Sequence, residues 1–241
     1  MDDPVIRLSF GNVAETYHRV RPPYSQRLLD HAQAQLELDA GARVLDLAAG
    51  TGRLTSELAR RFGDVIAVEP NDAMRSLISD GDVRAGSAES IPLQDASVDA
   101  VFVGEAFHWF DAAAAIGEIA RVLRPRGGLA IVGVHWWETE PPLSDAALEL
   151  LSKPYLRFSS QRGPRWDDFF DTSPFEPLQY ERLEDAVVLD PDALLALYST
   201  TSSLAALPHE ERNALFARVR PLLSGRYRLP IKYELTWTRL A

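Results

Sequence analysis

The sequence contains no cysteine among its 241 residues. This absence excludes disulfide bonds, zinc sites built on thiolates and catalysis by a cysteine nucleophile. Histidine is also scarce, with five residues, and no two of them have the H-x-x-x-H spacing of a helical metal site. We therefore expect no metal site in this protein.

Long apolar runs are absent as well. Arginine, aspartate and proline interrupt every apolar stretch before it reaches the length that spans a bilayer. The N-terminal segment MDDPVIRLSF is acidic and has no continuous apolar core, so it does not resemble a secretory signal. We expect a cytoplasmic protein that does not bind membranes.

Basic residues are in the minority, with 25 Lys and Arg against 35 Asp and Glu, for a net charge of −10 at pH 7. Such a surface repels phosphate backbones, so nucleic acid is not an expected partner. The apolar fraction of 46% is ordinary for a globular enzyme, and the length suits one large domain or a core with a smaller lid. The oligomeric state stays open.

Short apolar runs alternate with amphipathic stretches in the first half of the chain. Strands are predicted at 42–48, 65–69, 83–86, 98–104 and 129–135, and helices at 53–62, 72–79 and 111–124. Asn71 is a suitable N-cap for the second of these helices, and Pro125 with Gly127-Gly128 ends the third. Buried strands separated by helices predict an α/β fold with a doubly wound, Rossmann-like and mostly parallel sheet.

The flanking segments follow different patterns. The N-terminal region predicts two helices broken at Pro22-Pro23. Late in the chain, strands are predicted at 178–189 and 227–240, with two helices over 191–224 separated near Pro208. The last run alternates apolar and polar residues, which predicts an antiparallel strand that completes the sheet.

Three regions are therefore expected along the chain. Residues 1–40 would form N-terminal cap helices, and residues 41–135 a Rossmann-like core that binds a cofactor. Residues 136–241 would form a small helical lid with the substrate pocket, together with the C-terminal strands.

The strongest functional signal is the segment VLDLAAGTGRLT at 44–55. Gly50 and Gly52 stand between a strand and a helix, where the missing Cβ lets a ligand approach backbone N–H groups. Glu69 ends the next strand, 23 residues after Asp46, where an acid can accept hydrogen bonds from ribose hydroxyls. Taken singly, these features are equally typical of a tight turn and of solvated acids.

Several of these residues fall at the carboxyl ends of predicted parallel strands. Asp46, Gly50, Glu69, the loop 86–89 and Glu105 share this position. Ligands of doubly wound sheets bind beyond those ends, where the strand order reverses. We therefore expect these residues to converge on one crevice.

The glycine turn does not have the G-x-G-x-x-G pattern of nicotinamide sites. It reads Ala48-Ala49-Gly50-Thr51-Gly52, with Asp46 on the strand before it. A carboxylate there would repel a pyrophosphate but attract an ammonium, which favours S-adenosylmethionine, because that cofactor carries an ammonium and a sulfonium but no phosphate. An NAD(P)-dependent oxidoreductase and a non-catalytic S-adenosylmethionine-binding module remain as alternatives.

Four segments resemble successive motifs of the class I S-adenosylmethionine-dependent methyltransferases: VLDLAAGTG, VIAVEPNDAM, AGSAESIPLQDASVDAVFVGEAFHWF and EIARVLRPRGGLAIV. The N-terminal FGNVAETYHRVRPPY and the FHWF resemble the small-molecule branch, which includes trans-aconitate-type and ubiquinone-biosynthesis-type enzymes. The resemblance spans residues 9–135, whereas residues 136–241 share only the general layout. It implies in-line transfer of a methyl group to an oxygen, nitrogen or carbon nucleophile of a small-molecule substrate, which is the expected partner.

The resemblance also implies roles for single residues. Asp46 and the glycine turn would hold the methionine part of the cofactor, Glu69 would hold the ribose, and Pro70 and Met74 would flank the adenine. The implied cofactor-binding set is Tyr17, Arg21, Asp46, Ala48, Ala49, Gly50, Thr51, Gly52, Glu69, Pro70, Met74, Ser87, Ala88, Glu89, Glu105 and Ala106.

Two members of this set leave alternatives open. Ser87 stands where the family often has an aspartate that bonds the adenine amino group, so Glu89 or the backbone of Ala88 could make that contact instead. Tyr17 and Arg21 match an N-terminal Y-x-x-x-R-P feature that closes over the cofactor in the family. For Tyr17, an aromatic in the core of a helix face is an equal interpretation.

The segment EAFHWF, residues 105–110, would lie beside the transferred methyl group. His108 and Glu105 are the candidate catalytic residues, although methyl transfer needs a general base only if the nucleophile must lose a proton. His108 could be a base or one of the aromatics that line the substrate pocket, with Trp109, His135 and Trp136. A metal ligand is the third and least favoured role.

Aromatic residues after position 135 favour an apolar or aromatic substrate: Trp136, Trp137, Tyr155, Phe158, Trp166, Phe169 and Phe170. Arg157, Arg162 and Arg165 could instead pair with a substrate carboxylate. Each of these side chains could equally belong to the lid's own core or to its solvated surface. The sequence does not specify the substrate.

Overall fold

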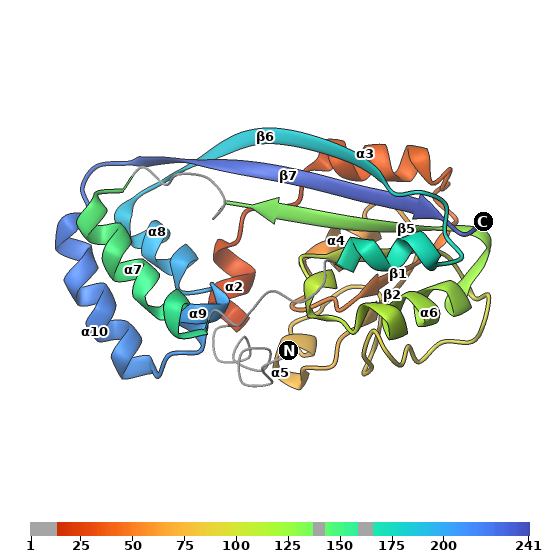
Figure 1. The fold of residues 1–241 in the computed structure, drawn as a ribbon, viewed down its shortest axis with the longest axis horizontal. Coiled ribbons are helices and arrows are strands. Elements are labelled where there is room, and N and C mark those ends of the chain that lie inside the picture. The colour runs from red at the N-terminus through yellow and green to blue at the C-terminus, as the bar shows by residue number, and fades with distance from the viewer. Residues whose placement is uncertain (1–13, 137–142, 159–165) are drawn as a thin grey trace. The chain divides into compact units, whose positions relative to one another are not determined.

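The computed structural model describes residues 14–136, 143–158 and 166–241 (Figure 1). These residues form two compact units. The sheet unit comprises residues 23–134, 166–183 and 233–241, and the helical unit comprises residues 14–22, 135–136, 143–158 and 184–232. The expected division into regions 1–40, 41–135 and 136–241 stays a prediction.

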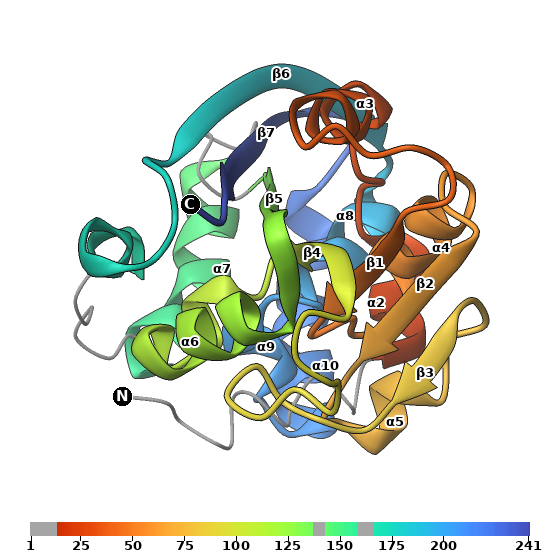
Figure 2. The same ribbon diagram turned by 90° about the vertical axis from the view of Figure 1, so that its right-hand side faces the viewer.

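One seven-stranded sheet runs through the fold in the order β3-β2-β1-β4-β5-β7-β6 (Figures 1 and 2). Its strands are β1 (Arg43–Leu47), β2 (Asp64–Val68), β3 (Asp82–Arg84), β4 (Val98–Gly104), β5 (Leu123–His135), β6 (Gln179–Leu189) and β7 (Tyr227–Arg239). Strands β1 to β5 pair in parallel, and the C-terminal strand β7 runs antiparallel to β5. The predicted mostly parallel, doubly wound sheet is confirmed.

The strand order reverses beside β1, which pairs with β2 on one side and β4 on the other. Because the three strands are parallel, the carboxyl ends of β1, β2 and β4 lie at the same end of the sheet. This reversal is the topological switch point at which doubly wound sheets bind their ligands. The predicted crevice residues follow these strand ends.

Helices cover both faces of the sheet. The sheet unit contains α3 (Gln26–Gln35), α4 (Arg53–Ala59), α5 (Asp72–Arg75), α6 (Ala112–Val122) and the 3-10 turns η2 (Phe107–Trp109) and η3 (Trp166–Thr172). Leu45 and Leu47 of β1 belong to the core that also holds Ile116 and Ile119 of α6. On the other face, Asp46 of β1 is hydrogen-bonded to α4. Alternate residues of the buried strand thus serve two helical layers.

The helical unit is built from α2 (Ala14–Val20), α7 (Asp145–Phe158), α8 (Pro191–Tyr198), α9 (Ser202–Ala205), α10 (His209–Val219) and the turn η4 (Arg220–Leu222). Its own core packs leucines of α8 and α9 against Ala147 and Leu151 of α7. None of the helices in the described part of the chain is both long and apolar enough to cross a membrane.

Several elements differ from the sequence prediction. The helix predicted over 111–124 ends at Val122, and β5 begins at Leu123, six residues before the predicted start at 129. The strand tolerates Pro125 and Gly127 because they lie where its pairing with β4 has a register shift, between the pairs Val98–Leu123 and Ala100–Gly128. The helix predicted over 72–79 ends at Arg75, and three helices rather than two lie between 191 and 219.

Other local predictions are confirmed. The Asn71 side chain accepts a hydrogen bond from the Met74 N–H and so caps α5. The break at Pro22-Pro23 separates α2 from α3, and the strands predicted at 178–189 and 227–240 are β6 and β7 within one residue at each end.

Candidate functional site

The glycine turn connects β1 to α4 through three residues with positive φ, Ala48 (57°), Gly50 (59°) and Gly52 (79°). A Cβ on Gly50 would lie 3.3 Å from the Met74 side chain, and one on Gly52 would lie 3.0 Å from that of Ile78. The two glycines therefore allow both the left-handed backbone and the close packing of the turn. The turn brings backbone N–H groups to the switch point of the sheet.

Asp46 is the buried acid of this site, with 1% of its surface exposed. One carboxylate oxygen, Oδ2, accepts a hydrogen bond of 2.6 Å from the Thr55 hydroxyl. The other, Oδ1, is buried and has no hydrogen-bond partner among the residues that the structure describes. Burial raises the pKa of the Asp46 carboxyl to about 7, Thr55 acts in the opposite direction, and the negative charge of Glu69 raises it further.

Glu69 follows β2 directly and is 5% exposed. Its Oε2 accepts a hydrogen bond of 2.9 Å from the Gly50 N–H, and its Oε1 accepts one of 2.8 Å from the Asn71 N–H. Glu69 thereby links the glycine turn to the start of α5. A carboxylate has about four lone-pair positions, so it can accept more than two hydrogen bonds.

These two acids give the site a definite chemical preference. Asp46 and Glu69 are both buried, and they interact as like charges. The unpartnered Oδ1 of Asp46 is a buried acceptor of the kind that costs free energy unless a donor reaches it. A ligand that carries an ammonium fits this requirement, and a pyrophosphate does not.

The predicted adenine-binding residues lie along the next two connections. Met74 is 8% exposed and packs in the glycine turn, and Ala88 is 3% exposed and belongs to the sheet core. Glu89 accepts a hydrogen bond of 3.1 Å from the N–H of Asp111, the residue that caps α6. Whether Ser87 or Glu89 contacts the adenine stays a prediction.

Glu105 follows β4 with a left-handed backbone, at φ 57°. Its N–H donates to the Val132 carbonyl at 3.0 Å, and its Oε1 accepts a hydrogen bond from the Val134 N–H. The side chain therefore joins the end of β4 to β5. This contact gives Glu105 a structural function beside its predicted role at the cofactor.

The remainder of EAFHWF forms the 3-10 turn η2, and its aromatic side chains have different environments. Phe107 is 2% exposed and packs against Phe110, Trp166 and Phe170, with ring centroids 5.2, 4.9 and 5.9 Å away. His108 is exposed and its ring lies 5.0 Å from that of Trp109. Phe107 thus fixes the turn in the core, while His108 is presented at the surface.

No group of three or more histidine, aspartate or glutamate side chains suited to hold a metal ion occurs among the described residues. The aromatic residues predicted for the lid divide between the two units. Trp166, Phe169 and Phe170 pack on the core of the sheet unit. Trp166 and Phe170 contact Phe107, which follows β4.

Four predicted site residues belong to the helical unit: Tyr17, Arg21, His135 and Trp136. Arg21 donates to the Thr200 hydroxyl at 2.9 Å and to the Thr200 carbonyl at 2.6 Å, and its guanidinium lies 4.7 Å from the Tyr17 ring centroid. Trp136 is 1% exposed and makes an edge contact with Tyr198, with centroids 5.2 Å apart. These residues form a packed cluster inside the helical unit, and their contact with a ligand stays a prediction.

The remaining predicted substrate residues cannot be placed in the site. Trp137, Arg162 and Arg165 lie outside the described residues, and so do the side chains of Tyr155, Arg157 and Phe158.

Sequence reasoning missed Thr55 and Tyr24. Thr55 is fully buried and orients Asp46, and the only signal for it was a polar residue on the inner face of α4. The Tyr24 hydroxyl would lie 2.3 Å from a Cβ on Gly104, so it occupies the space beside the last residue of β4. No local pattern indicates a contact between residues so far apart in the chain.

Comparisons with known proteins agree with this geometry. A family model described as a methyltransferase domain matches residues 45–131. An uncharacterized methyltransferase of Mycobacterium tuberculosis is 38% identical over 221 residues, which cover 90% of this chain and 86% of that protein. A methyltransferase-like protein of Schizosaccharomyces pombe is 32% identical over 219 residues, which cover 88% of this chain and 84% of that protein.

Solved structures share the fold at lower identity. A candidate type II methyltransferase of Anaeromyxobacter dehalogenans has a TM-score of 0.63 and 24% identity, and the match covers 91% of this chain and 97% of that one. The [4+2]-cyclase SpnF has a TM-score of 0.56 and 19% identity, with 98% and 93% coverage. The same fold therefore occurs in a protein named for a different reaction, so the fold alone does not specify methyl transfer.

Proposed function

The chain belongs to the class I methyltransferase family, and from this premise we propose that it binds S-adenosylmethionine and transfers the methyl group to a small molecule. The observation that carries the proposal is the buried, unpartnered Oδ1 of Asp46 beside the glycine turn. The sulfonium of the bound cofactor would supply an activated methyl group, and the protein supplies binding, orientation and electrostatics.

Asp46 would accept a hydrogen bond from the cofactor's ammonium, which would give its buried Oδ1 a partner. Glu69 would accept hydrogen bonds from the ribose hydroxyls, in addition to those that it accepts from the Gly50 and Asn71 N–H groups. The backbone of the glycine turn would lie against the methionine part of the cofactor.

The charge of the site supports a cationic ligand over a nucleotide with phosphates. Two buried acids, Asp46 and Glu69, repel one another, and a ligand that carries net positive charge relieves that repulsion. A pyrophosphate would add to it. This comparison favours S-adenosylmethionine over NAD(P) as the bound cofactor.

Isothermal titration calorimetry with S-adenosylhomocysteine and with NAD separates the two cofactor classes. We expect heat of binding for S-adenosylhomocysteine and none for NAD at the same concentration. Binding of NAD with no response to S-adenosylhomocysteine would contradict the proposal and favour an oxidoreductase.

The acceptor would be an oxygen, nitrogen or carbon nucleophile of a small molecule. The protein would hold this nucleophile in line with the cofactor's methyl group. Correct positioning alone can lower the barrier by roughly 7–11 kcal/mol, so a general base is not required. Incubation with cofactor labelled at the methyl carbon and a metabolite extract identifies the acceptor. Label found in no metabolite, with cofactor binding intact, would favour a non-catalytic binding module.

A further inference from the structure

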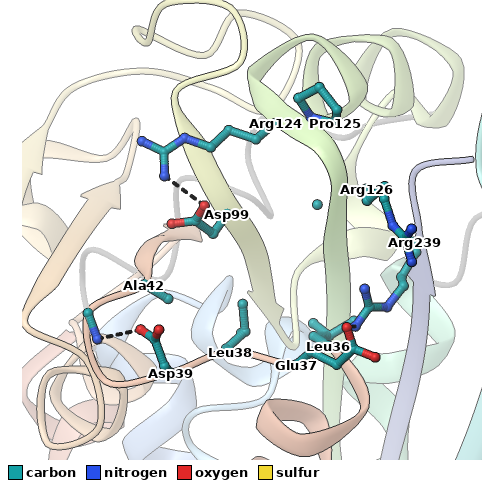
Figure 3. A pocket seen from close by; sticks show the side chains of 12 residues that line it. Leu36, Glu37, Leu38, Asp39, Ala42, Asp99, Arg124, Pro125, Arg126 and Arg239 are labelled. Atoms are coloured by element: carbon teal, nitrogen blue, oxygen red, sulfur yellow. Dashed lines mark hydrogen bonds and ion pairs between the residues drawn. The ribbon is translucent and has the colours of Figure 1, made fainter.

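A second pocket lies in the sheet unit, at the amino ends of β1, β4 and β5 and therefore at the opposite edge from the glycine turn (Figure 3). Its volume is about 410 Å³. The connection 36–42 between α3 and β1, Asp99 of β4, the start of β5 at 124–127 and Arg239 of β7 line it. Cavities that hold small molecules have volumes of roughly 300–1,000 Å³, so this pocket is large enough for one.

We propose that this pocket is a second binding site, which takes the carboxylate or phosphate group of a small organic anion at Arg126. The inference is independent of the proposed methyl transfer, because it concerns other residues at the other edge of the sheet.

The acidic side chains of the pocket already have partners. Asp99 accepts hydrogen bonds from the Arg124 guanidinium at 2.7 Å and from the Arg43 N–H at 2.8 Å. Glu37 forms an ion pair of 3.3 Å with Arg239, and Asp39 accepts from the Gly41 N–H at 2.8 Å. Figure 3 shows the Asp99–Arg124 pair and Arg239 on different walls of the pocket.

Arg126 differs from the other arginines. It is exposed, and no residue in the described part of the chain forms a hydrogen bond or an ion pair with it. Figure 3 shows its side chain on the same wall as Arg239, whose Nε and Nη2 donate to the Gln35 carbonyl. This wall therefore presents one guanidinium whose five donors are available to a ligand.

The backbone at Arg126 is unfavourable for an arginine. Its φ is 63°, and the described non-glycine residues with positive φ are Glu37, Ala48, Ala96, Glu105 and Arg126. Ala48 and Glu105 follow β1 and β4 at the cofactor edge, and Glu37 and Arg126 line this pocket. Non-glycine residues with a left-handed backbone are concentrated at functional sites. The conformation costs free energy, so it persists only where the surrounding structure holds it. A glycine at 126 would adopt the same backbone without this cost.

The strain makes a direct test possible, because Arg126→Gly removes the guanidinium and relaxes the backbone together. We would titrate the full-length protein with inorganic phosphate and with citrate in separate calorimetric experiments, at fixed ionic strength. Saturating S-adenosylhomocysteine in a parallel series keeps the anions out of the cofactor site. Arg126→Gln tests the loss of charge alone, and Arg228→Gln makes the same charge change at an exposed arginine of β7 outside the pocket.

We expect the wild type to bind at least one of the two anions, and both Arg126 variants to bind it on the order of tenfold more weakly. Arg228→Gln should bind as the wild type does, and Arg126→Gly should melt at an equal or higher temperature than the wild type. Binding of phosphate alone would assign the site to phosphate esters. Binding of citrate alone would assign it to organic acids.

Three results would overturn the proposal. The first is no binding of either anion by the wild type, and the second is equal affinity in the wild type and the Arg126 variants. The third is an equal loss in Arg228→Gln, which would reduce the effect to net charge. A lower melting temperature of Arg126→Gly would show that the backbone at residue 126 is not strained in the wild type. The anion affinity of Arg126→Gln would then decide whether Arg126 binds the ligand.

Discussion

Among single residues, Asp46 connects the stability of the protein to its function. Its pKa is about 7 in the folded protein against 3.8 for an unperturbed aspartate. Because the folded pKa is raised, ionisation of this group costs stability. The cost is absent well below about pH 4, grows as the pH rises and is complete above pH 7.

We expect Asp46→Asn to raise the free energy of unfolding of the cofactor-free protein at pH 8 by on the order of 3 kcal/mol, and to change it little near pH 4. Urea unfolding of both proteins at the two pH values measures this difference. If the difference in the free energy of unfolding between variant and wild type does not change with pH, the pKa of the Asp46 carboxyl is not raised by burial.

Thr55 acts on the cofactor site through Asp46, so it is a positioning residue. Its hydroxyl donates to Oδ2 at 2.6 Å and favours the ionised carboxylate. Thr55→Val keeps the shape but removes the donor, so we expect cofactor affinity to fall on the order of tenfold and the pH of half-maximal binding to rise. Thr55→Ser should restore both values. A loss of affinity in Thr55→Val without a shift in its pH dependence would indicate a packing effect only.

His108 has two open roles that kinetics can distinguish. Its side chain is exposed on the turn η2, which Phe107 fixes in the core. If it contacts the substrate as an aromatic, His108→Ala should raise the Michaelis constant of the acceptor and leave kcat within a few fold. A general base would instead lose about 10²–10⁴ in kcat, with substrate binding intact. Steady-state kinetics on the acceptor, once identified, gives both constants.

At the scale of elements, the end of β4 depends on a glycine. A Cβ on Gly104 would lie 2.3 Å from the Tyr24 hydroxyl and 3.0 Å from Leu54, whereas one on Gly117 in α6 would meet nothing within 4 Å. We expect Gly104→Ala to lower the free energy of unfolding by about 1–3 kcal/mol through overpacking. Gly117→Ala, the matched control, should raise it by about 0.5–1 kcal/mol. Equal effects in denaturant unfolding would show that Tyr24 does not pack against β4.

The elements of the parallel sheet were predictable because each strand is a short apolar run and each helix has its own cap or stop. Errors occurred where a distant partner decides the structure. Pro125 and Gly127-Gly128 have the sequence of a break, but pairing of Leu123 with Val98 extends β5 through them. Trp166 and Phe170 lie far from Phe107 in the sequence, yet they pack on it.

The part of the candidate site that lies at the strand ends was also predictable. Asp46, Gly50 and Glu69 lie on consecutive strand ends, so their proximity follows from the parallel topology. Thr55 and the contact of Glu105 with Val134 depend on side-chain direction, which the sequence pattern does not specify. The placement of Arg21 against Thr200 joins residues 179 positions apart, and no local signal precedes it.

For the molecule as a whole, sequence position does not separate the two units. The helical unit takes residues 14–22 from the N-terminal side and residues 184–232 from the C-terminal side, and β6 and β7 each contribute residues to both units. The comparisons show the family of the chain but not the acceptor of the methyl group. Fold comparison cannot supply the acceptor, since the same fold includes a cyclase.

The proposed methyl transfer requires that the protein binds S-adenosylmethionine through the buried Asp46. Calorimetric titration of S-adenosylhomocysteine at pH 8 into the wild type, Asp46→Asn and the exposed control Asp145→Asn tests it most directly. We expect binding by the wild type and the control, and a loss of about 1–3 kcal/mol of binding free energy in Asp46→Asn. Equal affinity in all three proteins, or no binding by the wild type, would contradict it.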